Sequence, residues 1–277
     1  MKPRQHPGSP SDFSPRRSLA QLGRLLPLCL ALAGAGPAQA AVSFFDDFGS
    51  YTTGSADAAF TANYFSTLTP TISASSGLGG TKSVENSGDL TLVRKTTAIN
   101  LLTSGENIIT LDIFFQWGGS AGLASPQLGV VGADTGVFNA GSAGDVSGRI
   151  NNAGTLELRS NNTELTRGAT LVLTSGNWYD LRAVITRTAT TNQFDITLGL
   201  YNSSTSGVVG SLVDSLSSTG FSNATLYGDT TLYAAARENS TVPRIDNFSL
   251  TQVPEPGAPL LAFCGVLAGR RRRRARN

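Results

Sequence analysis

Residues 108–117 read IITLDIFFQW, and the alternation of side chains along this stretch decides the fold. Five apolar side chains share one face of an extended chain: Ile109, Leu111, Ile113, Phe115 and Trp117. The opposite face carries polar groups, with Asp112 among them. A period of two is typical of a β-strand that buries one face and leaves the other polar. The stretch therefore predicts a strand that covers a core.

The same alternation recurs on both sides of this stretch. It is clear in Trp178–Ile185 and Phe194–Leu200, and shorter candidates are Leu90–Arg94, Thr155–Arg159, Thr170–Leu173, Thr230–Ala235 and Ile245–Thr251. Turn-forming Gly, Asn and Ser residues separate these segments, and no long helical period interrupts them. We interpret Gly80–Asn86 and Gly132–Gly148 as surface loops within one domain. The pattern predicts an all-β fold, a two-sheet antiparallel jelly-roll sandwich.

Residues 1–40 have the features of a secretory signal peptide. A basic segment precedes the apolar run Leu25–Ala35, and the small residues Ala38-Gln39-Ala40 follow it. We expect the Sec translocon to export the chain and signal peptidase to cut between Ala40 and Ala41.

The C-terminal segment, residues 253–277, has three parts in order. Pro254, Glu255 and Pro256 come first, and the prolines favour an extended, accessible chain. An uncharged apolar run, Ala258–Gly269, follows and favours lipid over water. A cluster of basic residues then stops transfer across a membrane: Arg270, Arg271, Arg272, Arg273 and Arg274.

This order of parts resembles the PEP-CTERM sorting signal of Gram-negative bacteria. The resemblance implies processing by exosortase after a transient stay in the inner membrane, and delivery to the cell surface or the extracellular polysaccharide matrix. The apolar run is shorter than the ~20 residues of a comfortable transmembrane helix. The span therefore borrows Val253–Gly257, or the arginine stems snorkel. The alternative is that the arginines form a basic arm that binds nucleic acid. Such an arm would not need the uncharged apolar run that precedes it.

The part of the chain between the two ends is acidic and lacks most reactive side chains. Residues 41–253 carry 10 Lys and Arg against 17 Asp and Glu, a formal charge of −7 that does not suit nucleic acid. His6 and Cys29 lie in the leader and Cys264 in the tail. The mature body therefore has no Ser-His-Asp triad, no Cys nucleophile, no zinc site with His or Cys ligands and no disulfide.

Three segments sharpen the prediction for this body, residues 41–252. Phe44–Tyr51, Gly176–Leu181 and Arg244–Leu250 together resemble the concanavalin A-like (laminin-G-like) jelly rolls that often precede PEP-CTERM tails. The resemblance implies that the first and last strands lie close, which would bring Asp46 or Asp47 near Asp246.

Asp46 and Asp246 are the candidate metal ligands. The period of two places Asp46 on the face of Phe44 and Phe48, and Asp246 on the face of Phe248. A carboxylate among core residues needs a partner, and calcium is the natural cation for oxygen ligands outside the cytoplasm. Many concanavalin-like modules hold a structural calcium, so the resemblance permits the same here. The alternative is that both aspartates cap strand ends or pair with Arg244, since two carboxylates fall short of the ~6–8 oxygens of a calcium site.

Carbohydrate binding and catalysis are the remaining functions to weigh. Five aromatic residues are candidates for stacking on sugar rings: Trp117, Trp178, Tyr201, Tyr227 and Tyr233. Core packing is the better interpretation for Trp117, and packing under a loop for Trp178. No strand carries Glu-x-Asp-x-Glu and no Gly-x-Ser-x-Gly elbow is present, so we predict that the chain is not an enzyme. Glycoside hydrolysis requires two carboxylates that flank the scissile bond, and it stays possible if two different strands supply them.

The sequence therefore predicts an exported surface or matrix protein with a non-catalytic β-sandwich body. The alternative is a lectin-like module that binds exopolysaccharide, and the least favoured is a glycoside hydrolase.

Overall fold

The computed structural model of the protein describes residues 42–85, 88–101, 108–118, 126–136, 138, 145–161, 163–229, 231–240 and 244–253, all within one compact unit. The predicted signal peptide, the Pro254–Pro256 motif, the apolar run and the arginine cluster lie outside these residues. No helix among the described residues is long and apolar enough to cross a membrane.

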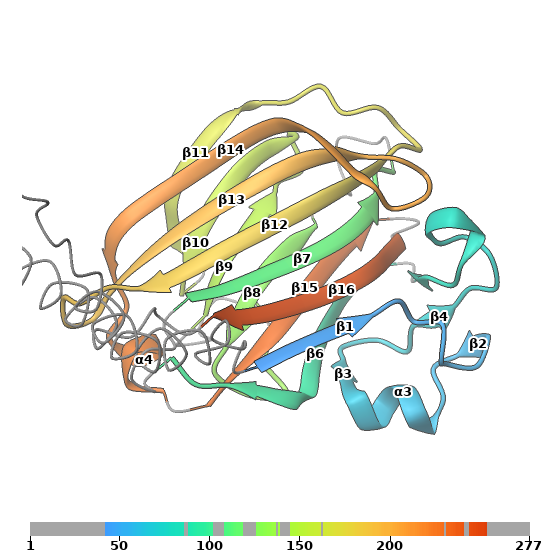
Figure 1. Ribbon diagram of the computed structural model, residues 1–277, viewed down its shortest axis with the longest axis horizontal. Helices are drawn as coiled ribbons and strands as arrows, with labels where there is room; N and C mark the ends of the chain where they lie inside the picture. The colour runs from blue at the N-terminus through green and yellow to red at the C-terminus, as the bar shows by residue number, and fades with distance from the viewer. Residues whose placement is uncertain are drawn as a thin grey trace, which may run out of the picture. The chain divides into compact units, whose positions relative to one another are not determined.

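The larger of two antiparallel sheets has nine strands (Figure 1). These are β1 (Val42–Asp46), β2 (Gly54–Ser55), β4 (Thr71–Ile72), β5 (Val84–Glu85), β7 (Ile108–Gln116), β12 (Trp178–Arg187), β13 (Gln193–Ser203), β14 (Val209–Ser222) and β16 (Arg244–Val253). Their order is β14-β13-β12-β7-β16-β5-β4-β2, and β1 pairs with β16. The predicted closeness of the first and last strands is therefore confirmed.

The second sheet has seven strands. These are β3 (Tyr64–Ser66), β6 (Gly88–Ile99), β8 (Gln127–Val131), β9 (Val146–Ile150), β10 (Thr155–Ser160), β11 (Thr163–Thr170) and β15 (Leu232–Ser240). Their order is β11-β10-β9-β8-β15-β6-β3. The described helices are short: α3 (Ala58–Asn63), α4 (Ala224–Gly228) and the 3-10 turn η2 (Leu78–Gly80).

The core lies between the two sheets, as the alternation predicts. Leu111 and Ile113 of β7 belong to one buried apolar cluster with residues of the facing sheet, such as Leu128 and Leu158. Trp117 belongs to the same cluster. Burying these faces against each other is what holds the two sheets together. The predicted all-β jelly-roll sandwich is confirmed.

Several segments differ from the prediction. The longest strand, β14, was not expected, because its Ser- and Gly-rich sequence is mostly exposed and shows little apolar alternation. Backbone pairing with β13 holds it in the sheet. The segment Thr170–Leu173 is not a strand, since β11 ends at Thr170. The end of the segment interpreted as the loop Gly132–Gly148 instead begins β9 at Val146.

A β-bulge in β16 changes the side to which Asp246 points. Asn247 has a left-handed φ of 47°, and the pairing of β16 with β7 shifts between Asp246 and Ser249. Ile245 and Phe248 therefore both enter the core, and Asp246 lies on the outer face beside its register partner, Phe114. The prediction that Asp246 shares a face with Phe248 is wrong, because one extra residue reverses the alternation.

Candidate functional site

The outer face of the nine-stranded sheet carries a tyrosine ring that lies across a glycine. Gly199 and Tyr201 alternate on β13, and a Cβ at position 199 would lie 2.8 Å from Cε2 and 3.1 Å from Oη of Tyr201. Glycine is therefore needed for the ring to lie along the sheet. The ring is half-buried, so part of it is open to solvent. An aromatic surface held in this way is suited to stacking against the apolar face of a ligand ring.

Arg182 on β12 lies beside this ring. Its register partners are Gly199 on β13 and Asp112 on β7, which places all three on the same face. The guanidinium carbon lies 5.3 Å from the centroid of the Tyr201 ring, and Nε donates to Oδ1 of Asp112. Stacking and the ion pair together fix the orientation of the guanidinium. We call Asp112, Asp180, Arg182, Gly199 and Tyr201 the platform site.

Asp180 is the buried member of the platform site. It is 0% exposed, and Nη2 of Arg182 lies 3.5 Å from its Oδ2. Its Oδ1 has no hydrogen-bond partner among the described residues. Burial, and then the charge of Asp112, raise the pKa of Asp180 to about 7, against the opposing charge of Arg182. Burial also raises the pKa of Asp112, although Arg182 acts to lower it. Two carboxylates from neighbouring strands thus share one guanidinium.

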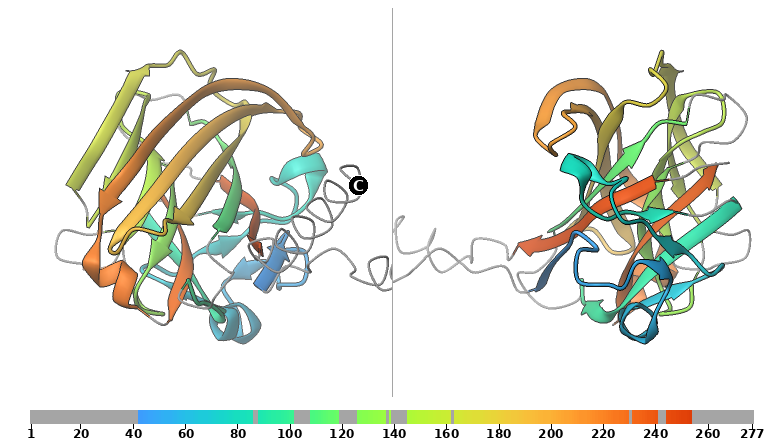
Figure 2. Two further views of the ribbon diagram at one scale, coloured as in Figure 1. Left: turned by 60° about the vertical axis from the view of Figure 1, so that its left-hand side comes forward. Right: turned by 90° about the vertical axis from the view of Figure 1, so that its right-hand side faces the viewer.

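One end of the outer face is closed by η2 and the β13–β14 turn. Leu78 of η2 packs with Phe114 and Trp178 in a small apolar cluster. The N–H of Gly79 donates to the carbonyl of Thr205 in the turn. Figure 2 shows β13 and β14 bending along their length, with their turn close to η2. This closure explains why Trp178 is buried although it lies on the outer face.

The other end of the face is open and rich in hydroxyl groups. Ser215 on β14 is paired with Gly199 on β13. The Oγ1 atom of Thr197 lies 3.0 Å from the Oγ atom of Ser217. All three hydroxyl side chains are exposed. The platform site therefore combines an aromatic surface, a charged donor, a charged acceptor and nearby hydroxyls. This set of groups can bind a ligand rich in hydroxyl groups.

Of the five aromatic candidates, only Tyr201 belongs to this site. Trp117 is buried in the core and Trp178 packs under η2. Tyr227 packs against the core with the Arg187 guanidinium carbon 3.7 Å from its ring centroid, and Tyr233 packs on a separate cluster. Arg182 is not among the site residues predicted from the sequence. The signal that could have identified Arg182 is a pair of alternations. Trp178, Asp180 and Arg182 alternate on one strand, and Gly199 and Tyr201 alternate on the strand that pairs with it.

Asp46 lies among hydrogen-bond donors. Its Oδ1 accepts from the N–H of Phe48 at 2.9 Å. Its Oδ2 accepts from Tyr51 Oη at 2.7 Å, Tyr64 Oη at 2.9 Å and Arg94 Nη1 at 3.0 Å. Arg244, the partner considered from the sequence, instead pairs with Glu85 at 2.9 Å.

Asp246 has a separate set of donors. Its Oδ2 accepts from the N–H of Leu78 at 2.8 Å and from Thr81 Oγ1 at 3.1 Å, and its Oδ1 accepts from the N–H of Asn247 at 2.7 Å. Asp46 and Asp246 thus share no partner in these contacts. No group of three His, Cys, Asp or Glu side chains that could hold a metal is found in the described part of the chain. Calcium at Asp46 and Asp246 stays a prediction, which the melting temperature with and without a chelator tests.

No family model matches the chain, and no curated protein matches its sequence. Solved structures do resemble its fold. A protein of unknown function from Shewanella oneidensis MR-1 is 15% identical, with a TM-score of 0.46, 90% of this chain covered and 98% of that one. The carbohydrate recognition domain of Emp46p is 9% identical (TM-score 0.44; 76% and 94% covered). A β-glucanase from Bacillus licheniformis is 12% identical (TM-score 0.37; 77% and 99% covered).

These similarities are at the level of a two-sheet β-sandwich and transfer no ligand or residue role to this chain. They agree with the expected jelly-roll body, whereas nothing in them shows a sorting signal. They also correct one prediction. The chain was predicted not to be an enzyme, and that exclusion is wrong, because structures of similar fold include a β-glucanase. The fold therefore gives no ground for excluding catalysis.

Proposed function

We propose that the chain is an exported surface or matrix protein whose β-sandwich body binds exopolysaccharide at the platform site. The observation that carries the binding proposal is the Tyr201 ring across Gly199, with the Arg182–Asp112 pair beside it. A sugar presents an apolar ring face to an aromatic side chain and hydroxyls to charged groups. Both kinds of partner lie next to each other on this face.

Affinity electrophoresis in gels that contain the exopolysaccharide tests this binding. Tyr201→Ala removes the stacking surface, and Tyr201→Phe keeps the ring while removing only the hydroxyl. A lost aromatic stacking contact corresponds to a roughly three- to tenfold weaker affinity. We therefore expect Tyr201→Ala to be clearly less retarded than the parent protein and Tyr201→Phe to be retarded like the parent protein. Equal retardation of all three proteins would refute binding at the platform site.

The proposed route to the surface rests on the two ends of the sequence. The Sec translocon exports the chain, signal peptidase cuts between Ala40 and Ala41, and exosortase acts at Pro254-Glu255-Pro256. The stop-transfer cluster Arg270–Arg274 holds the precursor in the inner membrane until then. Replacing Pro254, Glu255 and Pro256 with alanine should leave full-length protein in the inner-membrane fraction. Mass spectrometry of the released wild-type protein should find Ala41 at its N-terminus, and an intact Met1 would contradict the route.

Glycan hydrolysis is a second candidate, favoured by the two carboxylates of the platform site. A general acid needs a raised pKa, and burial raises the pKa of Asp180 to about 7, with the Asp112 carboxyl on the neighbouring strand. The complete burial of Asp180 ranks this candidate behind binding, because a substrate oxygen must reach the acid. Release of reducing ends from exopolysaccharide or β-glucans, abolished by Asp180→Asn, would establish it. No release by the parent protein would reject it.

A further inference from the structure

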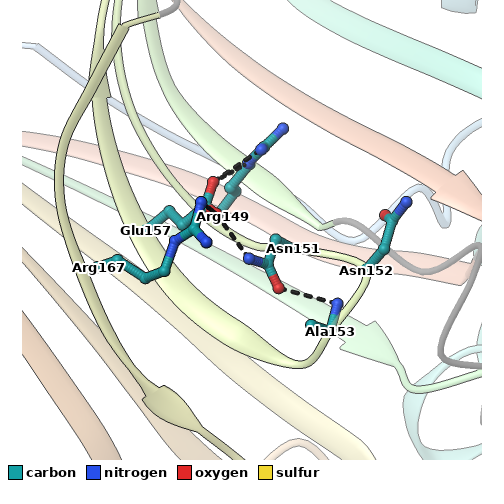
Figure 3. A pocket seen from close by; sticks show the side chains of 6 residues that line it. All are labelled: Arg149, Asn151, Asn152, Ala153, Glu157 and Arg167. Carbon is teal, nitrogen blue, oxygen red and sulfur yellow. Dashed lines mark hydrogen bonds and ion pairs between the residues drawn. The ribbon is translucent and has the colours of Figure 1, made fainter.

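The outer face of the seven-stranded sheet carries a hollow that the platform site does not use. Its volume is about 320 Å³. It is lined by Arg149, Asn151, Asn152, Ala153, Glu157 and Arg167, which we call the arginine hollow (Figure 3). Leu156 and Leu158 of β10 point into the core, so Glu157 between them points outward into the hollow. The arginine hollow and the platform site therefore belong to the outer faces of different sheets.

Glu157 is the centre around which the arginines gather. It is 1% exposed. Its Oε2 lies 2.7 Å from Arg149 Nη2 and 3.3 Å from Arg159 Nη1, and its Oε1 lies 2.8 Å from Arg167 Nη2. Asn151 Nδ2 also donates to Oε1 at 2.6 Å. Figure 3 shows the side chains of Arg149, Arg167 and Asn151 directed at this carboxylate.

The contacts keep Glu157 ionised. Burial alone would raise the pKa of Glu157, but hydrogen bonds from Asn151 and Arg149 and the charges of Arg149 and Arg167 outweigh it and lower the pKa. One full negative charge therefore faces three positive ones. Glu164 pairs with Arg167 at the rim. The side chains that line the hollow carry two positive charges, on Arg149 and Arg167, against the one negative charge of Glu157.

This excess is unusual in the chain around it. Residues 41–253 carry a formal charge of −7, yet three of their 10 basic residues converge on one glutamate. Satisfying a single buried carboxylate requires fewer cations than three. An acidic body would repel an anionic polymer everywhere except at such a cluster.

The guanidinium groups are held in place and keep donors for a ligand. Arg149 uses Nε and Nη2 on Glu157, and Arg167 uses Nη2 on both Glu157 and Glu164. The Nη1 groups of Arg149 and Arg167 take part in none of these contacts. A guanidinium carries five N–H donors in a plane that matches a carboxylate.

The turn beside the arginines is also fixed. Asn151 Oδ1 accepts from the N–H of Ala153 at 2.9 Å and of Thr155 at 3.0 Å. Gly154 closes the turn with a left-handed φ of 75°. The lining is therefore ordered without a ligand, which lowers the entropy cost of binding one.

We propose that the arginine hollow binds an acidic sugar unit of an anionic polysaccharide, with the carboxylate of a uronate on Arg149 and Arg167. The hollow is at the small end of the size range of ligand sites, which suits one sugar unit and exceeds what a lone anion needs. Its side chains are amides and charged groups, so hydroxyls find donors and acceptors there. The lining contains no aromatic residue, so recognition depends on charge and hydrogen bonds. This site stands independently of the platform site, and either can fail alone.

Binding of matched oligosaccharides by calorimetry tests the proposal. The probes are an oligomer of glucuronic acid, the same oligomer with its carboxyl groups reduced to alcohols, and inorganic phosphate. We expect the acidic oligomer to bind at least tenfold more tightly than the reduced one, with an affinity that falls as salt rises. Equal affinity for both oligomers would overturn the proposal. Phosphate that competes as strongly as the acidic oligomer would show a simple anion site and overturn the sugar assignment.

Matched variants place the binding. Arg167 is half-exposed, so Arg167→Gln should fold and should weaken binding of the acidic oligomer about tenfold. Arg237→Gln is the control, because Arg237 pairs with Asp89 on the same sheet but outside the hollow. It should bind like the parent protein. All variants carry the same termini, so the C-terminal arginines contribute equally.

Asn152→Ala gives a second variant that leaves the Glu157 contacts intact, and it should also weaken binding. Tyr201→Ala should leave binding of the acidic oligomer unchanged, which separates this site from the platform site. Unfolding midpoints identify any variant that fails to fold. Unchanged affinity in both Arg167→Gln and Asn152→Ala would overturn the assignment to this hollow.

Discussion

Asp46 of β1 and Arg94 of β6 form an ion pair, 3.0 Å between Oδ2 and Nη1, that joins the two sheets. Tyr51 and Tyr64 donate their hydroxyls to the same Oδ2. The Arg94 guanidinium carbon also lies 5.0 Å from the centroid of the Tyr64 ring. Burial is the main cause that raises the pKa of Tyr51 to about 12 and the pKa of Tyr64 well above its ordinary value. Both hydroxyls therefore keep their protons and act as donors. The carboxylate is thus the common acceptor of the region.

Asp46→Ala should destabilise the protein more than any exposed substitution. It leaves Arg94 and two tyrosine hydroxyls buried without their acceptor, and breaking a buried pair in this way costs about 3–5 kcal/mol. The free energy of unfolding from denaturant titration measures the loss. Asp47→Ala is the control, because Asp47 is exposed and contacts the N–H of Gly49. Its effect should stay within about 1 kcal/mol. A loss no larger for Asp46→Ala than for Asp47→Ala would contradict the role of the ion pair.

Asp180 should make the protein less stable as pH rises. Its pKa is about 7 when folded and has the ordinary value of 3.8 when unfolded. Between these values the folded state holds a proton that the unfolded state has lost. Stability therefore falls as pH rises through this window, by a total on the order of 4 kcal/mol. Asp246, whose pKa burial raises to about 6, acts with the same sign.

Asp180→Asn removes this dependence. The variant should be more stable than the parent protein at pH 8, and the difference should vanish below about pH 3, where the parent carboxyl is protonated in both states. Unfolding titrations at several pH values measure it. Asp195→Asn is the control for the replacement of an aspartate by asparagine, because Asp195 on β13 accepts from the exposed N–H of Gly220. If the free energy of unfolding varied with pH in Asp180→Asn as it does in the parent protein, the raised pKa of Asp180 would be contradicted.

Gly199→Ala should weaken polysaccharide binding by displacing the Tyr201 ring. The added Cβ would lie 2.8 Å from Cε2 of the ring, so the ring has to move off the sheet. The cost in stability should be about 1–3 kcal/mol, as for other overpacked sites. Gly168→Ala is the control, because its nearest neighbour would be at an ordinary 3.6 Å. Gel retardation and unfolding midpoints check both variants. Normal retardation of Gly199→Ala would show that ring position does not matter.

Local alternation predicted the core strands β7, β12 and β13, but it did not predict β8 or β9, which also supply core residues, and it could not predict the sites. The faces of β7, β12 and β13 follow from side-chain period, because each strand buries one face along its whole length. The platform site depends on which residues of β12 and β13 stand opposite each other, and this register is not local in sequence. The arginine hollow likewise needs the pairing of β9, β10 and β11. The burial of Asp46 does follow from the alternation, because Asp46 lies in the strand β1.

The alternation placed Asp246 on the wrong face of its strand because of the bulge at Asn247. Substitutions at Asn247 test what this bulge contributes. Asparagine adopts a left-handed φ at little cost, whereas a β-branched residue at a φ of 47° is strained. Asn247→Val should therefore destabilise the protein by about 1–3 kcal/mol, and Asn247→Gly should stay within about 1 kcal/mol of the parent.

Hydrogen exchange of the Leu78 amide shows what the bulge does for η2. This N–H donates to Asp246 Oδ2 at 2.8 Å, and that contact exists only while the bulge turns Asp246 outward. Removing the bulge would shift the strand by one residue and direct the carboxylate into the core, which its charge forbids. Asn247→Val should therefore expose the Leu78 amide to faster exchange, while Asn247→Gly keeps it protected. Because η2 closes the end of the outer face where Trp178 is buried, faster exchange should be accompanied by a shift in Trp178 fluorescence. Unchanged exchange and fluorescence in Asn247→Val would show that η2 holds its position without Asp246.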